Sequence, residues 1–181
     1  FPTRRSSDLA FTSISKTEEV AKNKGYRLTS NTTPLLDYSI EEIDLSDTTD
    51  KVDASRIDIK YSNYITTSYT YDKNEKVYKR STNGKDHIDY ITKKQYTTKN
   101  IIIAYISNSL IPNDNKGRQT LDNIGKGDGY YITNGVAVPI TWDKTNRKSK
   151  TVYKYKDGTT IKVNDGNTYI QIAPKNSASI K

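Results

Sequence analysis

Residues 69–89 read YTYDKNEKVYKRSTNGKDHID, and this stretch decides the fold that we expect. Polar residues alternate with tyrosine and valine on both sides of Asp72-Lys73-Asn74-Glu75, which predicts two strands joined by a four-residue turn. Asn83-Gly84 predicts a second, two-residue hairpin because both residues tolerate positive φ. The stretch therefore indicates two short antiparallel hairpins in series.

The rest of the chain extends this pattern. Asn100–Ser107, NIIIAYIS, is the most apolar run, and its length and β-branched residues favour a strand covered on both faces over a buried helix. Asn134-Gly135 predicts a hairpin into Val136–Trp142, where Pro139 indicates an edge or a bulge because it donates no backbone hydrogen bond. We expect a mainly β fold, an antiparallel, hairpin-rich sandwich or open barrel of about nine strands.

A short helix should precede the strands. Ser15 and Glu18 have the spacing of a capping box, which predicts a helix over Lys16–Lys24 that ends at Gly25. The expected organisation is residues 1–9, an artefactual leader resembling a translated sequencing adapter; 10–40, the remnant of a truncated N-terminal domain; 41–56, an acidic linker; 57–174, the β-rich C-terminal domain; and 175–181, a disordered tail.

Composition limits the chemistry and the partners. The chain has no cysteine and one histidine, which excludes disulfides and zinc–sulfur sites, and we expect neither a metal nor a cofactor. Fifteen tyrosines can enlarge a core that is poor in aliphatic residues. Residues 59–181 carry 21 Lys and Arg against 10 Asp and Glu. This excess favours a polyanion, and nucleic acid, anionic lipid head groups and anionic wall polymer all qualify.

An ordered set of short motifs resembles one known family. These motifs are Tyr69-x-Tyr71-Asp72, Tyr78-x-Arg80, Gly84-x-x-His87-x-Asp89, Gly127-x-Gly129, Ile140-x-Trp142-x-Lys144, Asp157-Gly158 and Gly166-x-Thr168-Tyr169-Ile170. Together with KGYRLTSN at Lys24–Asn31, they resemble the YerB-like lipoproteins from Thr17 to Pro174. The resemblance implies a Gram-positive, lipid-anchored protein on the extracellular face of the membrane, with no established activity. It also implies that most of the N-terminal domain and the lipidated cysteine are absent.

The candidate catalytic residues are His87, Asp89 and Asp72. A carboxylate beside a histidine can fix its tautomer and raise its basicity. The alternative is a histidine that a hairpin neighbour or solvent satisfies, and this alternative makes an enzyme the less favoured class. Asp114, Asp122 and Asp128 could hold calcium, although capped turns explain them as well. Gly125-x-Gly127-x-Gly129 lacks the following helix of a phosphate loop and indicates tight backbone turns.

Tyrosines interleaved with lysines and arginines are candidates for binding, because aromatic rings beside basic residues can stack on bases or sugars. The same alternation is typical of a half-buried strand with Tyr inward and Lys outward, and Trp142 continues an apolar face. The candidate binding residues are Tyr69, Tyr71, Tyr78, Arg80, His87, Trp142 and Lys144.

Three functions remain open from the sequence. The first is a non-enzymatic envelope domain that binds or scaffolds at the cell wall or membrane surface through a cationic face, with an anionic wall polymer, lipid head groups or an envelope protein as partner. The second is an enzyme acting on wall glycan or peptide through His87 and the nearby aspartates. The third is a module for single-stranded nucleic acid, which the implied location disfavours.

Overall fold

The computed structural model describes residues 12–30 and 32–181, so the expected leader at residues 1–9 lies outside the described residues. The chain divides into two compact units, Phe1–Pro34 and Leu35–Lys181, and each is described by itself. Within the described residues, no helix is both long enough and apolar enough to cross a membrane.

The described part of the first unit contains the expected helix, α1 (Ile14–Asn23). Its N-cap is Ser13, whose side chain accepts a hydrogen bond from the Lys16 amide at 3.1 Å, so the expected capping box at Ser15 is wrong by two residues. Gly25 adopts φ +67° after the last turn, as a left-handed stop requires. The prediction of a short N-terminal helix is thus confirmed.

The second unit is built from strands. Their bounds are β1 (Asp37–Ser39), β2 (Val52–Asp53), β3 (Arg56–Lys60), β4 (Thr66–Asp72), β5 (Val77–Thr82), β6 (Lys85–Asp86), β7 (Thr97–Thr98), β8 (Asn100–Tyr105), β9 (Ser107–Leu110), β10 (Gln119–Asp122), β11 (Gly125–Thr133), β12 (Val136–Lys144), β13 (Val152–Tyr155), β14 (Lys162–Asn164), β15 (Thr168–Ala173) and β16 (Ala178–Ile180).

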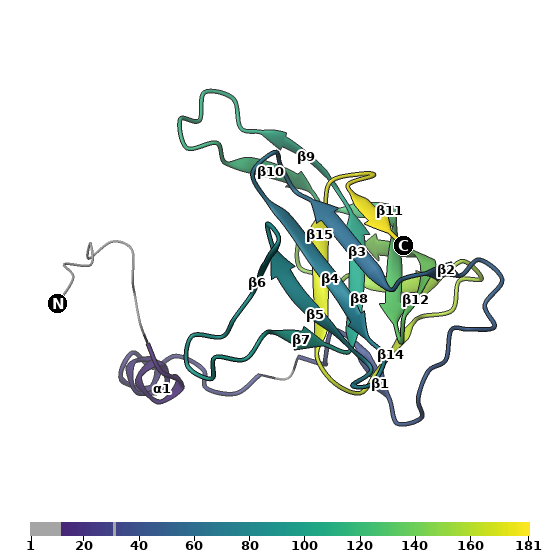
Figure 1. Ribbon diagram of the computed structural model, residues 1–181. Helices are drawn as coiled ribbons and strands as arrows, with labels where there is room; N and C mark the ends of the chain where they lie inside the picture. The colour runs from purple at the N-terminus through teal and green to yellow at the C-terminus, as the bar shows by residue number, and fades with distance from the viewer. Residues whose placement is uncertain (1–11, 31) are drawn as a thin grey trace. The chain divides into compact units, whose positions relative to one another are not determined.

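Two six-stranded sheets face each other (Figure 1). The β8 sheet has the order β13-β12-β11-β8-β15, with β2 beside β12, and the β4 sheet has the order β16-β3-β4-β5-β6, with β7 beside β5. One hydrophobic cluster contains residues of both sheets, Tyr69 and Tyr78 on the β4 sheet among them. Neither sheet closes into a barrel, because the strands at its two ends do not pair with each other. The expected mainly β fold is therefore confirmed, and it is a sandwich of two open sheets.

The interior strand β8 is buried on both faces, as its sequence predicts. Ile101 and Ile103 point into the cluster shared by the two sheets, whereas Ile102 and Ala104 belong to a second cluster on the opposite face. This second cluster contains Leu45 and residues of the segment 161–163. A strand whose residues alternate between two cores must be apolar on both faces, which explains the run IIIA after Asn100.

Strand pairing is less regular than the expected series of antiparallel hairpins. The Asn83-Gly84 and Asn134-Gly135 turns form with positive φ at both residues, as predicted. However, β15 pairs with β8 in parallel, and β1 pairs with β14 in parallel. Local turn residues cannot indicate such pairings, because the partners are far apart in the sequence.

Pro139 lies between the two segments of β12 that pair with different strands along the same edge. Strand β11 pairs with β12 along its whole length, but the other edge of β12 pairs with β2 at Val136–Ala137 and with β13 from Ile140 onward. Pro139 therefore occupies the gap between two partners, where a missing amide costs no ladder hydrogen bond.

Two segments that were expected to lie outside the β-rich domain pack against its sheets. In the expected linker 41–56, Leu45 is 4% exposed, and the Ile43 amide donates to the Asn164 side chain at 2.6 Å. The expected disordered tail is wrong, because β16 pairs with β3 and Ile180 packs against the shared cluster. A short apolar strand after Pro174 gains order from its neighbour rather than from its own sequence.

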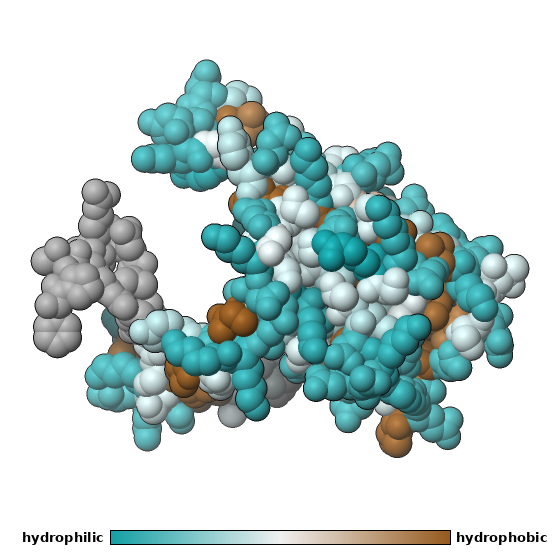
Figure 2. All heavy atoms as spheres, viewed as in Figure 1, coloured by the Kyte–Doolittle hydropathy of each residue, from teal (hydrophilic) through white to brown (hydrophobic). Residues whose placement is uncertain are grey.

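Two hairpins project from the sheets (Figure 1). One is β9–β10, all eight of whose residues are exposed. The other comprises residues 87–96, between β6 and β7, and is closed by hydrogen bonds between His87 and Tyr96 and between Asp89 and Lys94. We call it the 87–96 hairpin. Figure 2 shows a mainly hydrophilic surface in this view, with hydrophobic atoms exposed on both projections.

Candidate functional site

The tyrosines of residues 69–89 form core rather than a site. Tyr69 and Tyr78 are 0% exposed, so neither ring can meet a ligand at the surface. The Tyr69 hydroxyl accepts a hydrogen bond from the Gln171 side chain at 2.7 Å, and burial raises its pKa. The structure thus places Tyr69 and Tyr78 inward, as the interpretation as a half-buried strand expects, and gives neither ring a surface for binding. Tyr71 is half-buried, and its role in binding stays a prediction.

Tyr71 and Tyr78 join the two sheets at one end. Their rings lie 5.1 Å apart, and the Tyr78 hydroxyl accepts a hydrogen bond from the Gly135 amide at 3.0 Å. A Cβ atom added to Gly135 would lie 2.9 Å from the Tyr71 ring, so the Asn134-Gly135 turn packs directly against it. The two tyrosines thus hold the β11–β12 turn against the β4 sheet.

Arg80 and His87 meet beside the base of the 87–96 hairpin. The Arg80 guanidinium contacts Nδ1 of His87 and lies 5.6 Å from the Tyr169 ring centre. The His87 ring is 4.7 Å from the Tyr96 ring. His87 is exposed, and its neighbours are a cation and an aromatic ring, so the structure pairs it with no carboxylate among the described residues.

The two candidate carboxylates have separate structural roles. Asp72 accepts hydrogen bonds from Lys79 Nζ at 2.7 Å and from the Asn74 amide at 2.9 Å, which closes the β4–β5 turn. Asp89 accepts from the Thr92 amide and hydroxyl, both at 2.7 Å, and from the Tyr96 hydroxyl at 3.0 Å. These bonds lower the pKa of Asp89 to about 2, the Thr92 amide having the largest effect.

Asp72 and His87 also lie beside different residues of β5, the strand that both of them contact through the backbone. Asp72 pairs with Val77, whereas the His87 amide donates to the carbonyl of Arg80, three residues further along the strand. This offset is about 10 Å at the rise of a β-strand. The structure therefore does not assemble His87, Asp89 and Asp72 into one catalytic site, and the hypothesis of a wall-acting enzyme loses its geometric basis.

Trp142 is core at the opposite end of β11–β12. It is 4% exposed, and its indole nitrogen donates to the Tyr105 carbonyl at 3.1 Å. A Cβ atom on Gly127, its cross-strand partner, would lie 2.6 Å from the indole, so the ring covers this glycine. The prediction of tight turns at Gly125–Gly129 is wrong, because these residues belong to β11 and Gly127 is needed for close packing.

A groove of about 510 Å³ lies beside this tryptophan. Its half-buried aromatic residues are Tyr105 and Tyr130, whose rings are 6.3 Å apart at 89°. Burial raises the pKa of Tyr105, so its hydroxyl is a protonated donor at neutral pH. We call it the Tyr105–Tyr130 groove; its lining also includes Ser107, Asp122, Ile124, Lys126, Gly127, Asp128, Gly129, Pro139, Trp142, Lys156, Lys175 and Asn176.

Three lysines of this groove come from three different elements. Lys126 pairs with Asp143 at 3.3 Å and Lys156 pairs with Asp128 at 3.1 Å, and the two lysine side chains are 79% and 49% exposed. Lys175 is exposed in the connection between β15 and β16 and has no ion pair within the described part of the chain. Exposed ion pairs are weak, so a ligand anion can compete for these lysines.

An ordered cationic loop, residues 144–150, continues from the groove. Lys144 is the register partner of Gly125, next to Lys126. The Asn146 side chain accepts from the amides of Lys148 at 2.9 Å and Ser149 at 3.0 Å, and Lys144 Nζ donates to the Ser149 carbonyl at 2.7 Å. The turn leaves Arg147 and Lys148 exposed. Lys144, a predicted binding residue, thus shapes this loop.

Sequence reasoning missed the groove because its parts are dispersed. Tyr105 is at the end of β8, Tyr130 is in β11, and Lys175 belongs to the segment that was expected to be disordered. The available signal was the pair of glycines before Tyr130, because glycine inside a strand often marks a close approach by another group. Within the described residues, no group of three or more His, Asp and Glu is placed to hold a metal ion.

The chain is thus a β sandwich with a polar groove, and its candidate acid and base residues lie apart. A fold of this kind does not by itself define a function. The model of the family described as "Protein of unknown function (DUF3048) C-terminal domain" matches residues 57–170. This match covers more than half of the chain, and the chain belongs to that family. The YerB-like resemblance is confirmed.

Two comparisons with Bacillus subtilis agree with the family. The protein named "Putative lipoprotein YerB" of Bacillus subtilis (strain 168) is 29% identical over 168 residues, which are 91% of this chain and 47% of that protein. The crystal structure of YerB protein from Bacillus subtilis matches with a TM-score of 0.75 at 29% identity, covering 94% of this chain and 54% of the other. The chain spans about half the length of these relatives.

Proposed function

We propose that this chain is a non-enzymatic binding domain of a lipid-anchored protein on the extracellular face of the cell membrane, and that it binds an anionic wall polymer. The location is proposed from the relative that is named a lipoprotein. The observation that carries the binding role is the Tyr105–Tyr130 groove, where two tyrosine rings lie beside three lysines and the cationic loop 144–150 follows.

The chemistry of the groove suits a chain of sugars or polyols with regular negative charges. Tyrosine rings offer flat apolar faces and a hydroxyl donor, which contact a sugar or polyol without requiring a charge. Lysine ammonium groups bind phosphate or carboxylate as point charges. The excess of Lys and Arg over Asp and Glu in residues 59–181 attracts such a polymer before contact forms.

The test is retention of the purified chain on immobilised wall teichoic acid at low and high salt, with a neutral glycan as the comparison. We expect retention at low salt and its loss at high salt, because exposed charges are screened within about 10 Å at 0.1 M salt. The double variant Lys175→Glu and Arg147→Glu should lower retention strongly. A single-stranded oligonucleotide, bound more tightly than the wall polymer, would instead favour the nucleic-acid module.

A matched control separates the groove from overall charge. Lys73→Glu with Lys76→Glu makes the same change in net charge at exposed lysines in the β4–β5 turn. That turn lies at the end of the β4 sheet where Tyr71 packs on Gly135, whereas the groove and the 144–150 loop lie at the other end of β11–β12. Retention that is insensitive to salt, or that falls equally in the control, would contradict the proposed groove.

A further inference from the structure

The tip of the 87–96 hairpin exposes large apolar side chains close together. Tyr90 is 78% exposed, Ile91 is 85% exposed and Ile88 is 44% exposed. Single exposed apolar residues are common on protein surfaces, but three within four positions form a local patch. Two of the three lie at the turn of a projecting hairpin, where the chain is furthest from the sheets that could cover them (Figure 1).

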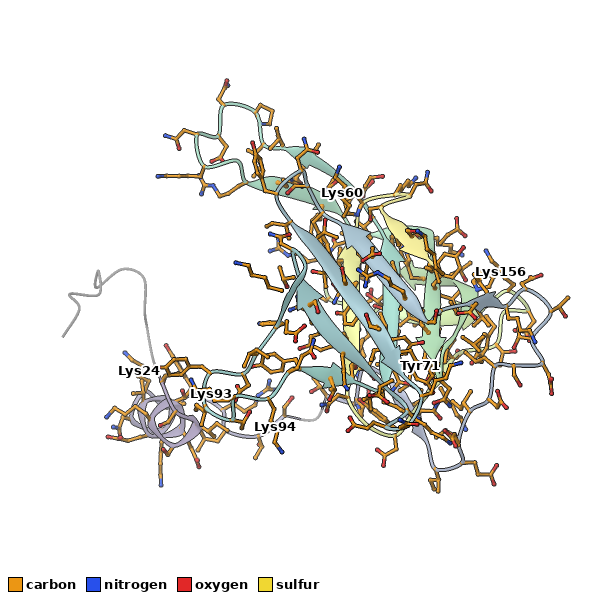
Figure 3. The ribbon with its side chains drawn as sticks, viewed as in Figure 1. Lys24, Lys60, Tyr71, Lys93, Lys94 and Lys156 are labelled. Carbon is orange, nitrogen blue, oxygen red and sulfur yellow. The ribbon has the colours of Figure 1, made fainter. Side chains whose placement is uncertain are left out.

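Lysines surround this patch. Lys93 Nζ lies 4.3 Å from the centre of the Tyr90 ring, Lys94 follows it, and Lys85 lies at the base of the hairpin. Figure 3 shows Lys93 and Lys94 on the part of the hairpin that extends away from the sheets. The two acidic residues of this segment, Asp86 and Asp89, accept hydrogen bonds from the hairpin itself.

The tip is held in shape before any partner arrives. Asp89 accepts from the amide and hydroxyl of Thr92, the Lys93 amide donates to the Asp89 carbonyl at 3.0 Å, and Lys93 adopts φ +60°. At the base, His87 contacts both Arg80 and Tyr96. An ordered tip loses little conformational entropy when it binds, so its exposed residues can contribute most of their burial free energy.

We propose that the 87–96 hairpin inserts Tyr90 and Ile91 into the interface of an anionic lipid bilayer, with Lys93 and Lys94 contacting the head groups. Tyrosine prefers the head-group level, an aliphatic side chain can enter the acyl boundary, and lysines gain from a negative surface potential. This charge complementarity selects the bilayer as occupant. Ile40, which is even more exposed, instead stands beside Glu41 and Glu42 and lacks this complementarity.

The proposal is independent of polymer binding, because the hairpin and the groove share no residue. The test is co-sedimentation of the whole chain with vesicles of phosphatidylcholine, with and without phosphatidylglycerol. We expect binding only when phosphatidylglycerol is present. Tyr90→Ser with Ile91→Ser should lower the partition coefficient by about tenfold or more, because two exposed apolar side chains no longer leave water.

A second double variant tests how much the lysines of the hairpin contribute to vesicle binding. Lys93→Gln with Lys94→Gln should weaken binding by about fivefold for each lysine lost, and only on anionic vesicles. The matched control is Tyr64→Ser with Ile40→Ser, which removes the same residue types at 85% and 104% exposure elsewhere. Equal loss in the control, or no binding to either vesicle, would overturn the proposal and leave a protein partner as the occupant to seek.

Insertion can also be observed directly. Trp142 is the only tryptophan and is 4% exposed, so it gives a constant background when an Ile91→Trp variant is mixed with vesicles. A blue shift of the new tryptophan on phosphatidylglycerol vesicles is expected. An unshifted spectrum under conditions where the protein sediments with the vesicles would show surface adsorption without insertion and would contradict the proposal.

Discussion

The strand pairs β4–β5 and β11–β12 contain similar residues but differ in what some of their tyrosines do. Both contain tyrosine beside polar residues, and both are joined by a tight turn. In β4–β5 the rings of Tyr69 and Tyr78 face the β8 sheet and are fully buried, whereas Tyr130 of β11 is only half-buried and lines a groove. Tyrosine therefore becomes core or surface according to what covers the strand, and the strand's own sequence does not decide it.

The largest effect on the free energy of unfolding should come from replacing a buried tyrosine of β4–β5. Tyr78→Ala removes a ring that is 0% exposed and is expected to lower the free energy of unfolding by about 3–5 kcal/mol. Tyr130→Ala should cost clearly less, because its ring is half-buried, yet it should reduce polymer retention. Denaturant unfolding of both variants, beside the retention assay, checks this; equal destabilisation would remove the distinction between the two strand pairs.

A smaller loss is expected where β11 and β12 pack most closely. Gly127→Ala places a Cβ 2.6 Å from the Trp142 indole, so the ring must move or the strand must shift. Such overpacking typically costs about 1–3 kcal/mol. Gly84→Ala is a useful comparison, because nothing lies within 4 Å of the added Cβ and only the positive φ of +74° opposes it. Tryptophan fluorescence should change in the first variant alone.

Features coded by neighbouring residues were predictable from the sequence. Asn83-Gly84 and Asn134-Gly135 specify their turns because both residues accept positive φ, and the run after Asn100 specifies a strand between two cores. The parallel pairing of β8 with β15 and the antiparallel pairing of β16 with β3 both depend on partners more than 60 residues away. No local pattern encodes those contacts.

The candidate site was less predictable than the fold. His87 and Asp89 are two residues apart and were candidate catalytic partners, but Asp89 caps the turn at Thr92 while His87 meets Arg80. Turn geometry replaced strand alternation there, because a carboxylate next to free amides forms local hydrogen bonds. The groove needed Lys175, whose position depends on the pairing of β16.

The smallest expected effect concerns the 87–96 hairpin, which extends the β4 sheet into solvent. The pKa of Asp89 is lowered to about 2 by hydrogen bonds from Thr92 and Tyr96, and the unfolded value is about 3.9. Since the folded pKa is the lower one, the stabilisation is complete above about pH 4 and is lost as the pH falls towards 2. Asp89→Asn at neutral pH should therefore speed hydrogen exchange of the Thr92 and Lys93 amides while barely changing the melting temperature.

Asp86→Asn provides the matched control, because it removes the same charge from β6, at the base of the hairpin. Asp86 accepts from Gln95 at 3.1 Å near the base and makes no contact with the turn at Thr92 among the described hydrogen bonds. Its exchange rates at Thr92 and Lys93 should stay at the wild-type level. If both variants loosen the tip equally, the hairpin is ordered by its overall charge rather than by the Asp89 cap. A fall in melting temperature with Asp89→Asn alone would show that the projection and the sandwich unfold as one cooperative unit.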